Sequence, residues 1–535
     1  MRKGLLLLTS VCMTPLVSLA QTDYQVSTEV QKKKVLLEEF TGIHCGWCPE
    51  GHKISQRMLK GMAGQAYAIN IHAGSYSEPN GGEPDYRTPE GDSLSVLLNS
   101  AEAGYPCGTI NREAYDGHTL YSRSLWIPLA QYYNEQDAPV NLYVKSVYDG
   151  ETGQLTVHVE GYYTAQPSAG THTLNVCWTQ SDILGPQNGG GVGDAYSHQH
   201  MLRDYVTPLW GDTLLAAQGQ YFVRDYVYTL PQAVGPAAVK PEDISVIAFV
   251  TTDKVGIENV EGGKPLYTHY NETPCGELKG PDMPIGTRYG YNYFDLYLKN
   301  KSSQRLTSAT FDVTVDGITE EQTVSCDIDQ FSTGAVRIPA TLRYAAKGKT
   351  KYSVVLTGLN GTEVTRDTLS GGFQKPAYTN TTVRFQITTD TQASQNQFLL
   401  KDADGNVVKE FGPYADGKVE TYTETATLEE GKTYCMEITD SWGDGMLSGG
   451  KGALVVRSGN NRLIDQFYTI TGYGVRSFFT VDTAAGIQNL PSHTEAAADT
   501  ECYTIDGRPA TQAPRGLYLV KQGDKTMKII NHKKQ

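Results

Sequence analysis

Cysteine is scarce in this chain, and so are long apolar runs and excess positive charge. The 535 residues contain nine cysteines, too few and too widely spread for a fold held by disulfides, so hydrophobic cores must stabilise it. After the first 20 residues, no window approaches the roughly 18 unbroken apolar residues that a membrane-spanning helix needs. The formal net charge of −14 argues against binding to nucleic acid and against docking on anionic lipid.

The first 20 residues have the pattern of a cleavable export signal. Arg2 and Lys3 precede an apolar stretch from Gly4 to about Leu16, and small residues follow up to Ala20. Removing the two basic residues takes the formal charge of the mature chain from −14 to −16. Export would place every cysteine after the signal in an oxidising compartment.

A Cys-x-x-Cys pair carries the strongest chemical signal in the chain. The apolar run Val35 to Phe40 predicts a buried strand, which leads through a turn to Cys45 and Cys48. Pro49 then predicts the start of a helix that continues to about Met62. The positive end of the helix dipole would stabilise the thiolate of the first cysteine, and we expect that cysteine to be the more exposed thiol. This arrangement favours dithiol–disulfide exchange.

The region resembles the thioredoxin-like superfamily. Together with Asn111-Arg112, it is most similar to the thioredoxin-like module of the family related to outer membrane protein 28, a resemblance that covers about the first half of the chain. The resemblance implies that Glu39 is a buried acid that takes the proton of Cys48. It also implies that Pro106 is the cis-proline whose loop faces the cysteine pair and binds substrate backbone. Cys107 departs from the pattern, because the residue after that proline is commonly Thr.

Other interpretations of these residues stay open at this point. Cys45 and Cys48 could form a static structural disulfide, or could bind zinc together with His44 and His52. Cys107 could be a third redox thiol or one half of a remote bridge.

From Val140 onward the chain is rich in alternating apolar residues and turn residues, which predicts hairpins and β-sandwiches. Within this part we interpret the glycines between Gly189 and Gly193 as a flexible loop. His198 and His200 would share one face of a strand, as two metal ligands can, but no third ligand is identifiable and loop packing is the favoured interpretation.

A loop near the end of the last predicted sandwich contains Asp440 and Asp444 among glycines. Spaced carboxylates of this kind are typical of calcium loops, although no glutamate follows at EF-hand spacing. A structural Asx-turn is the favoured alternative. Calcium, at Asp440 and Asp444, is the one cofactor candidate that we retain from the sequence.

The C-terminal 35 residues, 501–535, predict three short strands, too few to bury a core alone. Their Gly-Arg and Gly-x-Tyr elements resemble the C-terminal sorting domain of the type IX secretion system. The resemblance implies recognition by that machinery, passage across the outer membrane, removal of the tail, and release or attachment at the cell surface.

Together these observations predict a multidomain protein with an α/β thioredoxin-like domain, several all-β (Ig-like or jelly-roll-like) sandwiches and a small β sorting domain. The predicted function is thiol–disulfide exchange on extracytoplasmic proteins, and the alternative is a non-catalytic surface-binding or adhesion protein. The expected organisation is a signal peptide at 1–20, a thioredoxin-like domain at 21–137, a β-sandwich at 138–272, an Ig-like domain at 273–376, a second β-sandwich at 377–484, a linker at 485–500 and the sorting domain at 501–535.

Overall fold

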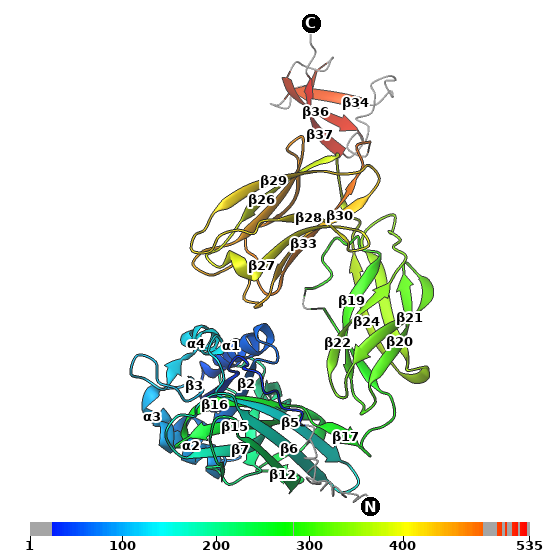
Figure 1. The fold of residues 1–535 in the computed structure, drawn as a ribbon. Helices are drawn as coiled ribbons and strands as arrows, with labels where there is room; N and C mark the ends of the chain where they lie inside the picture. Colours follow the sequence, from blue (N-terminus) through cyan, green and yellow to red (C-terminus); the bar gives the residue numbers. More distant parts are fainter. Residues whose placement is uncertain are drawn as a thin grey trace, which may run out of the picture.

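A computed structural model describes residues 24–281 and 283–484, together with the backbone of four short strands between 500 and 531. The signal peptide expected at 1–20 and nearly all of the linker expected at 485–500 lie outside the described residues. The described chain forms an N-terminal unit (residues 24–268), a middle sandwich (276–373), a distal sandwich (377–481) and a tail sheet (Figure 1). Among the described helices, none has the length and apolar character needed to span a bilayer.

The central sheet of the N-terminal unit has nine strands. Its central strands β1 and β2 are parallel, and β10 adds to β2 in parallel through the pair Met201–Asn70. In order the sheet contains β16 (Val255–Gly263), β15 (Ile244–Thr252), β7 (His172–Gln180), β10 (Met201–Tyr205), β2 (Ala66–His72), β1 (Val35–Thr41), β3 (Cys107–Ile110) and β4 (Tyr121–Ser122), with β11 (Asp212–Thr213) on β7.

This sheet continues across the boundary expected at 137/138. Strands from both sides of that position share it, so the segment expected to be a separate sandwich is built onto the N-terminal α/β sheet. A second sheet covers the β7–β15 part, and the two share a core that includes Val157, Trp178 and Val246. Its strands are β12 (Tyr221–Thr229), β6 (Gln154–Tyr163), β5 (Val140–Asp149) and β17 (Leu266–Thr268), and two small hairpins complete the unit, β8 (Ile183–Gly185) with β9 (Tyr196–His198) and β13 (Ala233–Val234) with β14 (Ala237–Ala238).

Helices cover both faces of the β1–β2 region, which is why β1 is buried along its whole length. Val35 and Leu37 pack against α1 and α4, whereas Leu36 and Phe40 point to the opposite face with Leu94 of α2. Alternate residues of a strand point to opposite faces, so Glu39 falls on the α1 side. The helices are α1 (Cys48–Gly61), α2 (Pro89–Leu98), α3 (Ser100–Ala103) and α4 (Trp126–Asn134), with short 3₁₀ turns at Ser75–Ser77, Arg123–Leu125, Gly193–Ala195, Pro241–Asp243 and Ala393–Gln395.

The middle and distal units are both two-sheet sandwiches with their own cores. The middle sandwich pairs β18 (Gly276–Lys279), β19 (Tyr293–Asn300) and β22 (Thr333–Pro339) with β21 (Ile318–Ile328), β20 (Leu306–Val315), β23 (Thr350–Leu359) and β24 (Thr362–Phe373). The distal sandwich pairs β25 (Ala377–Thr379), β33 (Gly474–Val481), β30 (Thr433–Asp440), β27 (Asn396–Asp402) and β28 (Val407–Phe411) with β29 (Thr421–Thr427), β26 (Thr382–Thr388), β31 (Ala453–Ser458) and β32 (Leu463–Phe467). The tail sheet contains β35 (Pro509–Ala510), β34 (Thr500–Thr504), β36 (Gly516–Gln522) and β37 (Lys525–Asn531).

Candidate functional site

The Cys-x-x-Cys pair lies between the end of β1 and the first turn of α1, where the sequence predicts it. Cys45 and Cys48 form a disulfide with their Cα atoms 5.4 Å apart, and Cys48 is the first residue of the helix. Both are buried, at 2% and 0% exposure, while Trp47 between them is 67% exposed. Cys45 is the more exposed of the two, as expected, but only by this small margin, because another segment covers the turn.

That covering segment consists of residues 187–189, which we call the strap. The Gln187 amide nitrogen Nε2 donates to the carbonyl oxygens of Gly42 and Cys45, at 3.1 and 2.9 Å. The backbone N–H of Asn188 donates to the carbonyl of Ile43 at 2.8 Å. Gly189, one of the glycines predicted to form a flexible loop, thus lies in a segment that is in close contact with the cysteine turn.

Gly189 shows how tight this contact is. Its φ of +76° lies in the left-handed region, and a Cβ at this position would lie 2.2 Å from the carbonyl oxygen of Gly46. Only glycine can bring the strap this close to the cysteine turn.

Glu39 and Pro106 meet beside the helix that carries Cys48. Glu39 is fully buried and neither carboxylate oxygen has a hydrogen-bond partner. A Cβ placed on Gly51 of α1 would lie 2.7 Å from Glu39 Oε1 and 3.0 Å from Pro106, so α1, β1 and the proline loop converge at this glycine. The Tyr105–Pro106 bond is cis. Burial raises the pKa of Glu39 well above the ordinary value for a glutamate, which suits a group that binds a proton.

Glu38, the residue before Glu39, has a charged partner. Glu38 points to the other face of β1 and forms a bidentate ion pair with Arg112, with bonds of 2.6 and 2.7 Å. Neighbouring glutamates on one strand therefore have opposite surroundings: one is paired with a cation and the other is kept without a partner.

Cys107 is a buried free cysteine, and no other described cysteine pairs with it. Burial and the neighbouring Glu39 raise the pKa of the Cys107 thiol to about 12. A thiol that stays protonated is a poor nucleophile, which favours a packing role for Cys107 over that of a third attacking thiol.

The zinc interpretation finds no support in the geometry. His44 lies 3.0 Å from the Glu83 carboxylate, and both ring nitrogens of His52 have other partners. Within the described part of the chain, no group of three or more His, Cys, Asp or Glu side chains is arranged to hold a metal ion.

A buried histidine cluster adjoins Glu39, and sequence reasoning did not find it. His52 of α1, His72 of β2 and His198 of β9 have ring centroids 5.3 Å (His72–His198) and 6.5 Å (His52–His198) apart. Tyr86 and Tyr196 pack around them. The expectation that His198 and His200 share a strand face is wrong, since β9 ends at His198 and His200 has a left-handed φ of 51°. The missing signal is non-local, because the three histidines come from three separate elements.

Asp440 and Asp444 come together at the end of β30, as the calcium hypothesis requires. Asp440 Oδ1 accepts the backbone N–H groups of Trp442 and Gly443, each at 2.7 Å, which is the expected Asx-turn. Its Oδ2 and the Oδ1 of Asp444 are buried without a partner. Burial raises the pKa of Asp440 to about 6, and Asp444 adds to the rise.

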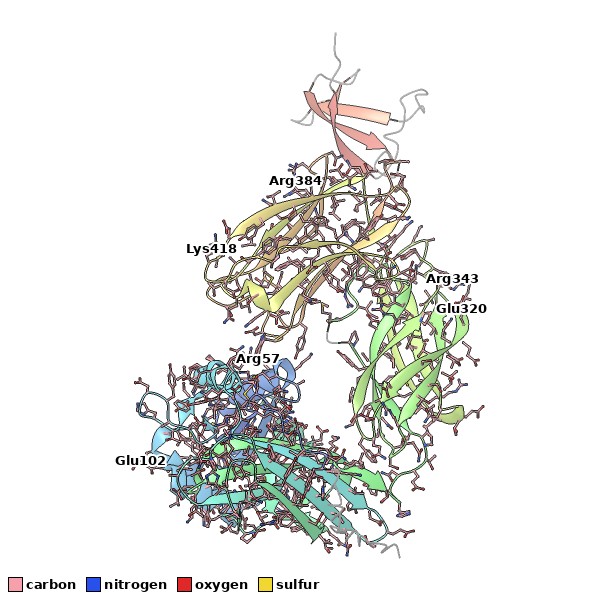
Figure 2. The ribbon with its side chains drawn as sticks, viewed as in Figure 1. Arg57, Glu102, Glu320, Arg343, Arg384 and Lys418 are labelled. Atoms are coloured by element: carbon pink, nitrogen blue, oxygen red, sulfur yellow. A yellow bond between two sulfur atoms is a disulfide. The ribbon has the colours of Figure 1, made fainter. Side chains whose placement is uncertain are left out.

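This loop also touches the N-terminal unit. Arg57 Nη1 lies 3.9 Å from Asp444 Oδ2, and Figure 2 shows Arg57 on the edge of the N-terminal unit that faces the distal sandwich. Lys60 Nζ lies 3.3 Å from the centre of the Tyr473 ring. The Asp440–Asp444 loop is therefore part of a contact between units, in which the Asp444 carboxylate faces Arg57 of α1.

Part of this chain matches a known protein family. The sequence profile of the family described as outer membrane protein Omp28 matches residues 99–266. No curated protein matches the chain. Among solved structures, HBP35 of Porphyromonas gingivalis is 18% identical with a TM-score of 0.37, and the alignment covers 63% of this chain and 99% of that one. A domain of the outer membrane lipoprotein Omp28 from Porphyromonas gingivalis is 17% identical with a TM-score of 0.18, covering 24% of this chain and 91% of that one. The segment of this chain that matches the Omp28 family is thus the one that supplies Pro106 and the strap, and it begins after the cysteine pair.

Proposed function

We propose that this chain is an exported thiol–disulfide oxidoreductase that acts on extracytoplasmic proteins. The observation that carries the proposal is the Cys45–Cys48 disulfide at the start of α1, beside a buried Glu39 without a partner and a cis Pro106. The sequence resemblance to thioredoxin-like proteins supports the same assignment. Cys45 is the attacking thiol, Cys48 the resolving thiol, Glu39 the proton acceptor and Pro106 the residue that shapes the substrate loop.

In the reducing direction, two electrons pass from the dithiol to a substrate disulfide. The thiolate of Cys45, favoured by the N-terminus of α1, attacks one substrate sulfur and the other leaves as a thiolate. Cys48 then gives its proton to Glu39 and attacks Cys45, which closes the internal disulfide and releases the second substrate thiol. The same steps in reverse oxidise a substrate dithiol.

Substrate access requires this turn to open, because both cysteines are buried and the strap is hydrogen-bonded to the backbone of the turn. Trp47 stays exposed at the edge of the turn, with the Arg123 guanidinium 5.5 Å from its ring. An apolar segment of a substrate protein would meet this indole first. Catalysis is then gated by local opening, as in enzymes whose lids control access.

The second candidate is a non-catalytic surface-binding or adhesion protein in which the disulfide is static. The burial of both cysteines beneath the strap is the observation that favours it. In that case the sandwiches make the contacts with partners, since a fold alone does not determine activity.

We place the protein at the outer membrane surface or in the extracellular space. Three features support this location: the signal-like N-terminus, the sorting-like tail, and the match of residues 99–266 to a family described as outer membrane protein. The type IX secretion machinery would be the export partner, reading the tail.

Trapping of mixed disulfides tests the activity. In the full chain reduced with dithiothreitol, Cys48→Ala should accumulate a covalent adduct with a disulfide-containing protein such as insulin, and Cys45→Ala should not. Cys275→Ala serves as the matched control, because Cys275 is an exposed free thiol that could react without specificity. If Cys48→Ala forms no adduct that depends on Cys45, the disulfide is static and the scaffold function holds.

A further inference from the structure

Glu39 lies where its proton has no direct route to water. Its side chain has no exposed surface, and the groups around it are Gly51, Pro106, Cys107 and His52. A carboxyl that accepts a proton in each catalytic cycle must also release it. The route has to pass through a neighbouring side chain that can both accept and donate.

His52 has this capacity and the required position. Its Nε2 lies 3.6 Å from Glu39 Oε1 and 3.0 Å from the hydroxyl of Thr41. Its Nδ1 lies 2.7 Å from the hydroxyl of Tyr196, which is only partly buried and leads toward the surface. The two ring nitrogens thus face the carboxyl on one side and an outward-leading hydroxyl on the other.

The surroundings keep His52 neutral. Burial, with smaller contributions from His198 and His200, lowers the pKa of His52 to about 3. A neutral imidazole has one donor nitrogen and one acceptor nitrogen, so it can take a proton at Nε2 while it releases one from Nδ1. Burial, with Glu39 adding to it, raises the pKa of Tyr196 to about 12, so this hydroxyl stays protonated and also passes a proton by accepting one and donating another.

Among the described residues, Arg203 is the cation that acts on this cluster. The titratable groups that face His52 and its neighbours are Glu39, Tyr86, Cys107, Tyr196, His72, His198, His200 and Arg203. Burial lowers the pKa of His72 well below its ordinary value and that of His198 to about 4, so both stay neutral near pH 7. The route from Glu39 to Tyr196 therefore runs through uncharged rings.

We propose that His52 and Tyr196 form a proton relay that connects Glu39 with solvent during the resolving step. The inference rests on the proposed thiol–disulfide exchange and names further residues of that site. Cys48 gives its proton to Glu39; Glu39 gives it to His52 Nε2; His52 releases its Nδ1 proton to Tyr196, whose own proton passes to water. One proton leaves the site for each disulfide that Cys48 closes. When the disulfide is next reduced, a proton passes inward by the reverse route, from water through Tyr196 to His52 Nδ1 and from Nε2 to Glu39 and the Cys48 thiolate, which restores the starting tautomer of the imidazole.

Tyr196 makes the relay a property of the whole N-terminal unit. It comes from β9 in the segment inserted between β7 and β10, which also contains the strap. One inserted segment thus covers the disulfide and completes the exit route for its proton.

The experiment follows 5,5′-dithiobis(2-nitrobenzoate) reacting with the reduced full chain carrying Cys275→Ala. A first release of thionitrobenzoate reports attack by Cys45, and a second release, abolished by Cys48→Ala, reports the resolving step. We expect His52→Gln and Tyr196→Phe to slow the second release by about tenfold or more while the first is unchanged, because an assisted proton transfer is worth at least that much. The solvent deuterium isotope effect on the second release should also change in both variants.

Tyr86→Phe is the matched control. Tyr86 contacts His72 and His198 but lies outside the Glu39–His52–Tyr196 route, and it loses the same single hydroxyl. When the rate of the second release is plotted against pH, His52→Gln and Tyr196→Phe should lower the plateau and leave the midpoint, which Glu39 sets, unchanged. A midpoint that shifts, or a second release slowed equally by Tyr86→Phe, would overturn the relay in favour of a general disturbance.

The experiment distinguishes failure of the thiol–disulfide function from failure of the relay alone. Absence of any second release in the parent protein refutes the thiol–disulfide function itself. A second release that Glu39→Gln slows but that both His52→Gln and Tyr196→Phe leave unchanged refutes the relay alone.

Discussion

Removing the Gln187 side chain should open the cysteine turn. In the structure this amide donates two hydrogen bonds to the turn, to the carbonyls of Gly42 and Cys45. At about 1 kcal/mol each, their loss in Gln187→Ala shifts the opening equilibrium of the strap by about 2 kcal/mol, or roughly 30-fold. When opening and closing are fast, reaction at the disulfide follows the open population, so its rate should rise by the same factor.

The rate of reduction of the Cys45–Cys48 disulfide by dithiothreitol measures this opening, with fluorescence of the neighbouring Trp47 as the signal. Gln199→Ala is the control, because that side chain lies in the same inserted segment but bonds to Asp182 and Ser197. Gly189→Ala provides a second, independent perturbation that displaces the strap through backbone contact. Equal reduction rates in the parent, Gln187→Ala and Gly189→Ala would refute the gating role of the strap.

Three further predictions concern other parts of the chain. Because burial raises the pKa of Glu39, the folded protein loses stability as pH rises from the ordinary carboxyl pKa through the raised one, at up to about 1.4 kcal/mol per pH unit. In calorimetry from pH 4.5 to 8, Glu39→Gln should melt at the same temperature as the parent at the acid end and at progressively higher temperatures than the parent as pH rises. Deleting 501–535 should retain the protein in the periplasm, and intact-mass analysis of the surface form of the full chain should show that both the signal and the tail are absent; a truncated protein that still reaches the surface would remove the type IX assignment. Millimolar calcium, but not magnesium, should raise the melting temperature of the distal sandwich, more at pH 8 than at pH 5 because the pKa of Asp440 is about 6. The Asp440→Asn, Asp444→Asn double variant should lose this shift, and no shift in the parent would mean that the loop is structural.

Local patterns in the sequence were sufficient to predict the turn with Cys45 and Cys48 and its immediate neighbours. The strand before Cys45, the helix after Pro49 and the proline at 106 all depend on adjacent residues, and the structure has each element in place. Glu39 followed from its offset to the cysteines in related proteins, and its burial beside Pro106 agrees with that expectation.

The strap, the histidine cluster and the continuous sheet could not be predicted in the same way. Gln187 and Tyr196 reach the site from more than 130 residues away, and nothing in their local pattern distinguishes them from ordinary loop residues. The boundary expected at 137/138 marked a true change in composition, but parallel pairing of β10 with β2 is a long-range contact that composition does not encode. The glycines at 189–193 likewise indicate a turn without indicating what the turn contacts.

The loop around Trp442 closes the chain into a ring. Its indole packs against Gly61 at the end of α1, where an added Cβ would lie 3.0 Å from the ring, and Arg57 and Lys60 add contacts with Asp444 and Tyr473. These contacts are few, yet they join units already held near each other by the middle sandwich, so a high effective concentration allows a small interface to persist. The helix that begins at Cys48 therefore ends at a hinge point between units, and a force applied at the tail would reach it by two routes: along the covalent chain and through this contact. A methyl group at Gly61 would press on the second route at the point where Trp442 packs against the core beside α1.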